Sequence, residues 1–239
     1  MGESIKRIVG PYQDSYSPTG IIGEKDACGV GFIANVKGIE SNWILKQSLK
    51  GLNCMEHRGG CGGDSDSGDG AGILCSIPWG FLEEKINQKN TQEFNRGLGM
   101  VFMPNKKEKI EICKSICDKE AEKLKVNETS WRTVPVNNEI LGPLAKANAP
   151  FICQWILYID QKDHQDVERL LFQLRKRIEK QIRETFKNDV GDCEFYFASL
   201  SSQTVVYKGM VRSEILSEFY QDLKEESFKV SFSVYHRRF

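Results

Sequence analysis

The chain has 239 residues, of which 40% are hydrophobic, so it can form a substantial core in one large or two small domains. Its 33 basic and 33 acidic side chains balance, so no net charge attracts it to nucleic acid or to an anionic membrane. No apolar run approaches the roughly 20 residues of a membrane span, and eight cysteines in a chain of this length favour free thiols over a disulfide framework.

The N-terminal part divides into a leader and the first strand. Residues 1–27 contain Pro11, Pro18 and little apolar periodicity, so we expect an extended leader. The compact domain is predicted to begin at Cys28. From there Cys28, Val30 and Phe32 alternate with other residues, which predicts a half-buried strand whose glycines leave its second face open.

A helix and an unusual loop follow. Ser41 is placed to cap a helix whose apolar positions, from Ile44 to Met55, have helical spacing. The helix runs into the sequence CMEHRGG, and a loop rich in glycine and aspartate then leads to the short strand AGILCSI, which ends at Pro78.

The middle of the chain alternates between predicted strands and helices. LGMVFM predicts a strand, and the continuous apolar run FICQWILYI predicts a strand that is buried on both faces. Apolar residues at helical spacing predict helices over about 110–124 and 167–182. We expect the basic residues of the second helix to lie on its solvated face.

The last third predicts strands and one short helix. CEFYFASLS and TVVYKGM are separated by a few polar residues, which predicts an antiparallel hairpin and a sheet that is not purely parallel. A helical stretch at about 215–223 precedes FKVSFSVYHRRF. Because this strand pattern runs to the last residue, we expect that the sequence stops inside a domain.

One group of residues has the composition of a zinc site. Cys54, His57, Cys61 and Cys75 are ligand types for tetrahedral zinc, although Cys75 lies in an apolar strand where a buried thiol is the commoner case. A zinc-stabilised binding module without catalysis therefore stays open as an alternative function. The aspartate-rich loop lacks the EF-hand glycine and glutamate and the P-loop lysine, so we predict no calcium or phosphate binding there.

Cys28 has the surroundings of a nucleophile. It follows the leader directly, so one cleavage would expose its thiol and a free α-amine together. An α-amine with a pKa near 8 can accept the thiol proton without a separate histidine. A self-processing peptidase would use the same chemistry, and a buried structural cysteine is the alternative from spacing alone.

Four motifs carry a resemblance to a known family. DACGVGFIANVKG, CMEHRGGCGGDSDSGDGAGILCSIPWGF, SLSSQTVVYKGM and FSVYHRRF together resemble the amino-terminal glutaminase domain of the large glutamate synthases, ferredoxin-dependent type. The resemblance implies that residues 1–27 are a propeptide and that 28–239 form part of a class II glutamine amidotransferase domain. It implies an α+β fold, the N-terminal-nucleophile αββα sandwich of two antiparallel sheets, incomplete at the C-terminus.

The resemblance also implies roles for individual residues. Cys28 would be the catalytic nucleophile, and His57, Arg58 and Gly59 would shape the pocket. The family motif H-x-R-[FY] corresponds to His236 through Phe239, so Arg238 would clamp the α-carboxylate of glutamine through its planar fork. The family's oxyanion-hole residues lie beyond this motif, so the chain alone is expected to be inactive.

The implied activity is glutamine hydrolysis for glutamate biosynthesis. Ammonia released through a thioester on Cys28 would pass to 2-oxoglutarate in a complete protein. FMN and an iron–sulfur cluster would lie outside this chain, and the reductant would be ferredoxin or a nicotinamide-linked reductase subunit. Abundant Lys, Asn and Ile favour a plastid gene, and hence the plastid stroma, with a bacterial cytoplasm as the alternative.

Overall fold

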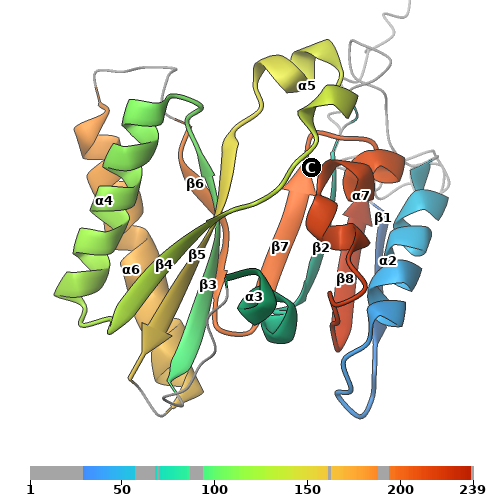
Figure 1. The fold of residues 1–239 in the computed structure, drawn as a ribbon, viewed down its shortest axis with the longest axis horizontal. Helices are drawn as coiled ribbons and strands as arrows, with labels where there is room; N and C mark the ends of the chain where they lie inside the picture. The colour runs from blue at the N-terminus through green and yellow to red at the C-terminus, as the bar shows by residue number, and fades with distance from the viewer. Residues whose placement is uncertain are drawn as a thin grey trace, which may run out of the picture.

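Two four-stranded antiparallel sheets form the centre of the molecule, seen in Figure 1. The computed structural model describes residues 29–56, 68, 70–86, 94–160, 163–187 and 194–237. In the first sheet the order is β1-β8-β2-β7, with strands β1 (Gly29–Ala34), β8 (Phe232–Arg237), β2 (Ala71–Ser76) and β7 (Thr204–Gly209). In the second sheet the order is β4-β5-β3-β6, with strands β4 (Glu128–Thr133), β5 (Phe151–Ile159), β3 (Asn95–Met103) and β6 (Tyr196–Ser201).

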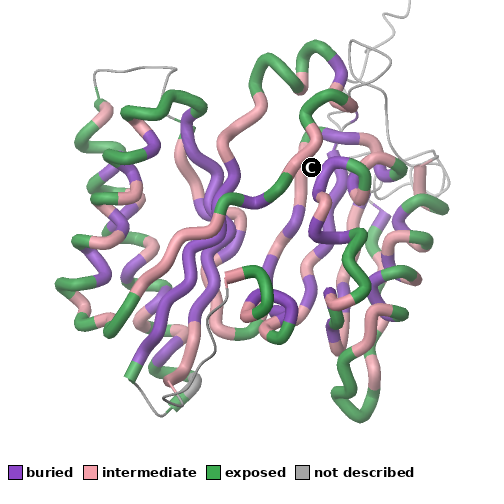
Figure 2. The backbone as a smooth tube through the Cα atoms, viewed as in Figure 1, coloured by how far each residue is buried: buried purple, intermediate pink, exposed green. Residues whose placement is uncertain are grey.

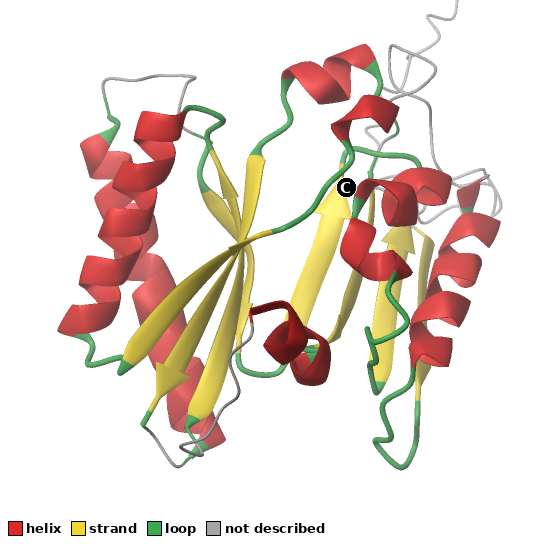
Figure 3. Ribbon diagram, in the orientation of Figure 1, coloured by secondary structure: helices red, strands yellow, loops and turns green. Residues whose placement is uncertain are grey.

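Helices flank both sheets, as Figure 3 shows. The two long helices α4 (Lys107–Lys123) and α6 (His164–Thr185) cover the outer face of the second sheet, and α2 (Asn42–Cys54) packs on β8 and β1. Shorter helical elements connect the strands: α3 (Trp79–Ile86), Asn138–Ile140, α5 (Pro143–Ala147), Ser213–Ile215, α7 (Leu216–Phe219) and Gln221–Lys224. This arrangement is the predicted α+β sandwich.

Apolar side chains gather in two cores, which account for the buried segments of Figure 2. One core lies between the second sheet and the helices α4 and α6. The other combines the opposite face of that sheet with α2, α3, α7 and residues of the first sheet. The run FICQWILYI serves both cores, since residues 152–159 are all buried, and this prediction is confirmed.

A buried polar network joins the two sheets. Arg132 on β4 donates to both carboxylate oxygens of Asp222, at 2.6 and 2.7 Å, and to Oε1 of Gln154 on β5. Tyr207 on β7 accepts a hydrogen bond from Gln154 and donates one to Asp222. The guanidinium and the carboxylate therefore compensate each other's charge in a region from which water is excluded.

The prediction for the first strand was wrong about which face is buried. Val30 and Phe32 are 66% and 76% exposed, whereas the glycine face is covered. A Cβ added to Gly31 would lie 2.5 Å from the ring of Tyr235 on β8, and the same ring meets Gly51 of α2. The absent side chains thus leave room for Tyr235 between the strand and the helix.

The predicted hairpin was also wrong, although both of its strands exist. β6 pairs with β3 in the second sheet, and β7 pairs with β2 in the first sheet. The short connection between Ser201 and Thr204 therefore passes from one sheet to the other. Every pair of strands between described residues is antiparallel, so the sheets are indeed not parallel.

The basic residues of α6 are only partly a solvated face. Arg175 donates to Glu179 and to the carbonyl oxygen of Phe197 on β6, so it ties the helix to the second sheet. Within the described part of the chain, no helix combines the length and the apolar character that crossing a bilayer requires.

Candidate functional site

The five residues predicted for the site all lie outside the described residues: Cys28, His57, Arg58, Gly59 and Arg238. The aspartates of the glycine-rich loop lie outside them as well. The structure does describe the residues next to this set along the chain. Their geometry therefore defines the framework to which the predicted site residues are attached.

Three strands end together at this framework. Gly29 at the start of β1 pairs with Arg237 at the end of β8, and Arg237 also pairs with Ala71 at the start of β2. The antiparallel order of β1, β8 and β2 brings these termini together where the strands end, and we call this end of the first sheet its edge. Gly29 is bonded covalently to Cys28, and Arg237 to Arg238.

A buried ion pair lies at the same edge. Arg237 is fully buried, and its Nη2 donates to Oε1 of Glu56 at 3.1 Å. Its Nη1 donates to the carbonyl oxygen of Gly70 at 2.8 Å. Nε has no acceptor among the described residues.

The segment after β7 completes the framework. The backbone N–H of Ser213 donates to Oε2 of Glu56 at 3.1 Å, and Nε of Arg212 lies 3.6 Å from Oε1 of the same carboxylate. A Cβ added to Gly68 would lie 2.8 Å from the backbone nitrogen of Arg212. Only glycine allows this backbone approach, so both ends of the glycine-rich loop are held by one segment.

The described cysteines do not support the alternative of a zinc site. Cys54 is exposed at the end of α2, whereas Cys75 is buried in β2. Burial raises the pKa of the Cys75 thiol well above its usual range, as expected for a thiol in an apolar strand. His57 and Cys61 lie outside the described residues. Among the residues that are described, no group of three or more His, Cys, Asp or Glu is arranged to hold a metal ion.

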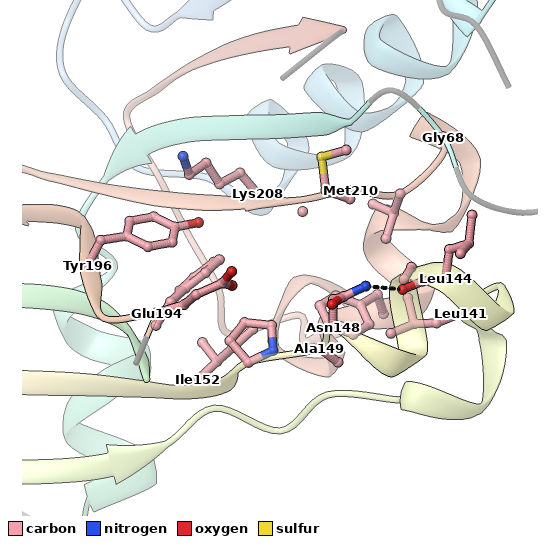
Figure 4. Close-up of a pocket in the computed structure, with 16 residues that line it drawn as sticks. Gly68, Leu141, Leu144, Asn148, Ala149, Ile152, Glu194, Tyr196, Lys208 and Met210 are labelled. Carbon is pink, nitrogen blue, oxygen red and sulfur yellow. Dashed lines mark hydrogen bonds between the residues drawn. The ribbon is translucent and has the colours of Figure 1, made fainter. Parts of the chain in front are cut away.

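A cavity of about 470 Å³ lies between the end of β7, with the segment that follows it, and the second sheet, and α5 lines it as well (Figure 4). Its walls are mostly apolar, and polar groups come from four side chains: Asn148, Glu194, Tyr196 and Lys208. Burial and the nearby Glu194 raise the pKa of Tyr196 to about 12, and burial and Arg175 lower the pKa of Lys208. Gly68 lines the cavity as well, whereas the predicted site residues lie outside the described residues.

Comparisons with known proteins identify relatives along almost the whole chain. The sequence model of a family described as "Glutamine amidotransferases class-II" matches residues 28–239. The chloroplastic ferredoxin-dependent glutamate synthase of Oryza sativa subsp. japonica is 42% identical over 233 residues, which cover 96% of this chain and 14% of that protein. Ferredoxin-dependent glutamate synthase 2 of Synechocystis sp. is 43% identical over 223 residues, 92% of this chain and 14% of its own length. The chain thus spans about one seventh of the length of these relatives.

Proposed function

The chain belongs to the class II glutamine amidotransferases, and we propose that it supplies the glutamine-hydrolysing part of a glutamate synthase. The family match over residues 28–239, together with 40–43% identity to ferredoxin-dependent glutamate synthases, is the observation that carries this proposal. The relatives are about seven times longer than the stretch they share with this chain. The complete synthase reaction is accordingly a proposal about a longer protein.

We propose Cys28 as the nucleophile, freed by cleavage after Ala27. Its α-amine would accept the thiol proton, and the sulfur would attack the side-chain amide carbon of glutamine. Ammonia would leave with that proton, and water would then hydrolyse the thioester to glutamate. Two observations support this assignment: the family match begins at residue 28, and Gly29 is held in register at the sheet edge.

Arg238 is proposed to bind the α-carboxylate of glutamine. It directly follows Arg237, the register partner of Gly29, so the candidate clamp and the candidate nucleophile are each attached to one member of the same pair. A guanidinium suits this role because its planar fork bonds both oxygens of a carboxylate. His57, Arg58 and Gly59 follow Glu56 and are proposed to shape the pocket.

In the complete protein, the ammonia is proposed to add to 2-oxoglutarate, and reduction would yield a second glutamate. That reduction would call for FMN and an iron–sulfur cluster, and we assign neither group to residues of this chain. The names of the relatives favour ferredoxin over a nicotinamide-linked subunit as the electron donor. Chloroplastic and cyanobacterial relatives support the plastid stroma, with a bacterial cytoplasm as the alternative.

Replacing the nucleophile tests the proposal on the full product of the gene. Cys28→Ser should abolish glutamine-dependent glutamate synthesis and leave ammonia-dependent synthesis within about twofold, because only the first route needs the thiol. Cys54→Ser, at an exposed cysteine, is the matched control and should change neither activity. Loss of both activities in the Cys28 variant would instead assign that cysteine a structural role.

The mass of the purified protein tests the cleavage independently. Removal of the leader predicts a mature chain that begins with Cys28. A protein that hydrolyses glutamine with the leader still attached would contradict the role of the free α-amine, since a peptide nitrogen cannot accept the thiol proton.

A further inference from the structure

The guanidinium of Arg237 is bonded to segments on both sides of the glycine-rich loop. It donates to the carboxylate of Glu56 and to the carbonyl oxygen of Gly70. Glu56 immediately precedes His57, and Gly70 immediately follows Asp69. One side chain therefore fixes the distance between the point where the chain leaves α2 and the point where it enters β2.

The backbone of Arg237 is fixed as well. It pairs with Gly29 of β1 and with Ala71 of β2. Gly29 adjoins Cys28, and Arg237 adjoins Arg238. Three of the candidate site residues thus adjoin this arrangement directly. Cys28 is bonded to Gly29, His57 to Glu56, and Arg238 to Arg237 itself.

We propose that Arg237 is a positioning residue for glutamine hydrolysis. It sets the relative placement of the nucleophile Cys28, the pocket loop that starts at His57 and the clamp Arg238, and it does not contact the substrate itself. This inference rests on the proposed function, since it assigns a role within the same site. Misplacement of reacting groups by about 1 Å can cost roughly a hundredfold in rate.

An arginine is required for this geometry because two acceptors from different segments must be bonded in one plane. The guanidinium has a rigid fork of donors and keeps its charge when buried, whereas the ammonium of lysine is a single point on a flexible chain. Glu56 is held from the other side by the N–H of Ser213. A lysine at position 237 would therefore retain the charge but release one of the two segments.

The test compares two conservative substitutions in the full product of the gene. Arg237→Lys replaces the forked guanidinium, which donates to Glu56 and Gly70, by a single ammonium group. Arg132→Lys is the matched control, because Arg132 is mostly buried, with 10% of its side chain exposed, and bonds Asp222 in a forked manner, but it lies in the network between the sheets. Glutaminase kcat and KM are measured at a temperature where circular dichroism shows both variants to be folded.

We expect both variants to lower the thermal midpoint, and only Arg237→Lys to lower kcat, by about tenfold to a hundredfold. KM for glutamine should stay within about threefold, because Arg238 is unchanged. A purely structural role predicts that kcat is the same in both folded variants, and that result overturns the proposal. A rise in KM with unchanged kcat also overturns it, since Arg237 would then act in binding.

A milder substitution covers the case in which Arg237→Lys does not fold. Glu56→Gln keeps one acceptor oxygen for Arg237 but removes the charge and turns the other acceptor oxygen into a donor, so kcat should fall about three- to tenfold, and the thermal midpoint should fall less than in Arg237→Lys. An unchanged kcat in this variant would contradict the proposal. If the wild-type protein itself releases no ammonia from glutamine, the proposed function fails; if it does and Arg237→Lys matches Arg132→Lys, only the positioning role fails.

Discussion

Burial separates the five cysteines that the structure describes into two chemical classes. Cys75, Cys113, Cys117 and Cys153 have no exposed surface, whereas Cys54 is exposed. Burial raises the pKa of Cys153 to about 11. Burial also raises the pKa of Cys117 well above its usual range, and the neighbouring Cys113 adds to the effect. Because the thiolate is the reactive form, the buried thiols should be inert in the folded protein.

Alkylation of the native protein tests this difference. Iodoacetamide at neutral pH should modify Cys54 and leave the four buried cysteines intact, as read by mass spectrometry of peptides. The same treatment in denaturant is the control and should modify all of them. Stoichiometric modification of Cys117 in folded protein would show that the helix α4 is not packed as described.

Glu120 makes a contribution to stability that depends on pH. Its carboxylate accepts hydrogen bonds from Lys123 and from Arg177 of α6, and the bond from Lys123 is the largest cause of its lowered pKa, followed by opposing burial and then by Arg177. A carboxyl whose pKa is lower in the folded state stabilises the protein above the unfolded pKa. That contribution is lost as the pH falls through the folded value.

The variant Glu120→Gln should therefore be less stable than wild type at neutral pH, and the difference should shrink once the pH falls below about 4.5, the ordinary pKa of the group. Urea unfolding of both proteins at about pH 7 and about pH 3.5 measures the difference in their free energies of unfolding. The exposed Glu184, which lies 3.8 Å from Lys180, provides Glu184→Gln as a control with little effect at either pH. A stability difference that grows on acidification would show that folding does not lower the pKa of Glu120.

At the scale of elements, the strand β1 is held on its glycine face. The ring of Tyr235 fills the space above Gly31 and Gly51, and a Cβ at Gly51 would lie 2.5 Å from its Oη. Among the described strands, β1 pairs with β8 and with no other. Close packing of the ring between strand and helix is therefore a main attachment of β1 to the rest of the molecule.

Two helical glycines should respond in opposite directions to alanine. Gly51→Ala should lower the free energy of unfolding by about 1–3 kcal/mol, because overpacking against Tyr235 outweighs the better helix propensity. Gly80→Ala in α3 is the control, since nothing lies within 4 Å of its added Cβ, and it should be neutral or stabilising by up to about 1 kcal/mol. Equal effects of the two substitutions, measured by denaturant unfolding, would contradict the close contact with Tyr235.

Periodicity predicted the elements whose environment is uniform along their length. α6 buries Val167, Leu171 and Leu174 as its stripe requires, and β5 is buried throughout. Periodicity failed where a distant residue decides the environment, as Tyr235 does for β1. It also missed α3, α5 and β4; β4 has no fully buried residue, and so it lacks a clear apolar pattern.

The candidate site was predicted from the resemblance, and its supporting contacts were not predictable in that way. Glu56 and Arg237 are separated by about 180 residues, and a single sequence contains no signal of which buried charges will pair. The register between β1 and β8 joins residues equally far apart in the sequence, so a single sequence does not predict it either. A motif thus indicates which residues act, whereas the contacts that hold them follow from the assembled fold.

At the scale of the whole molecule, the network of Arg132, Gln154, Tyr207 and Asp222 holds the two sheets together. Asp222→Ala would leave the buried guanidinium of Arg132 without its counter-charge, so we expect a loss of about 3–5 kcal/mol in the free energy of unfolding. Removing one partner of the exposed pair Lys46–Glu226, as Glu226→Ala, should cost less than about 1 kcal/mol. Comparable losses would show that the network contributes no more than a surface ion pair.

The pairing of β1 with β8 also determines when the site can form. The two strands are separated by roughly 200 residues, which a ribosome takes about 10–40 s to add at 5–20 residues per second. During that time β1 lacks β8, its one neighbour among the described strands of the sheet. The edge that carries the proposed nucleophile can therefore assemble only after β8 has been synthesised.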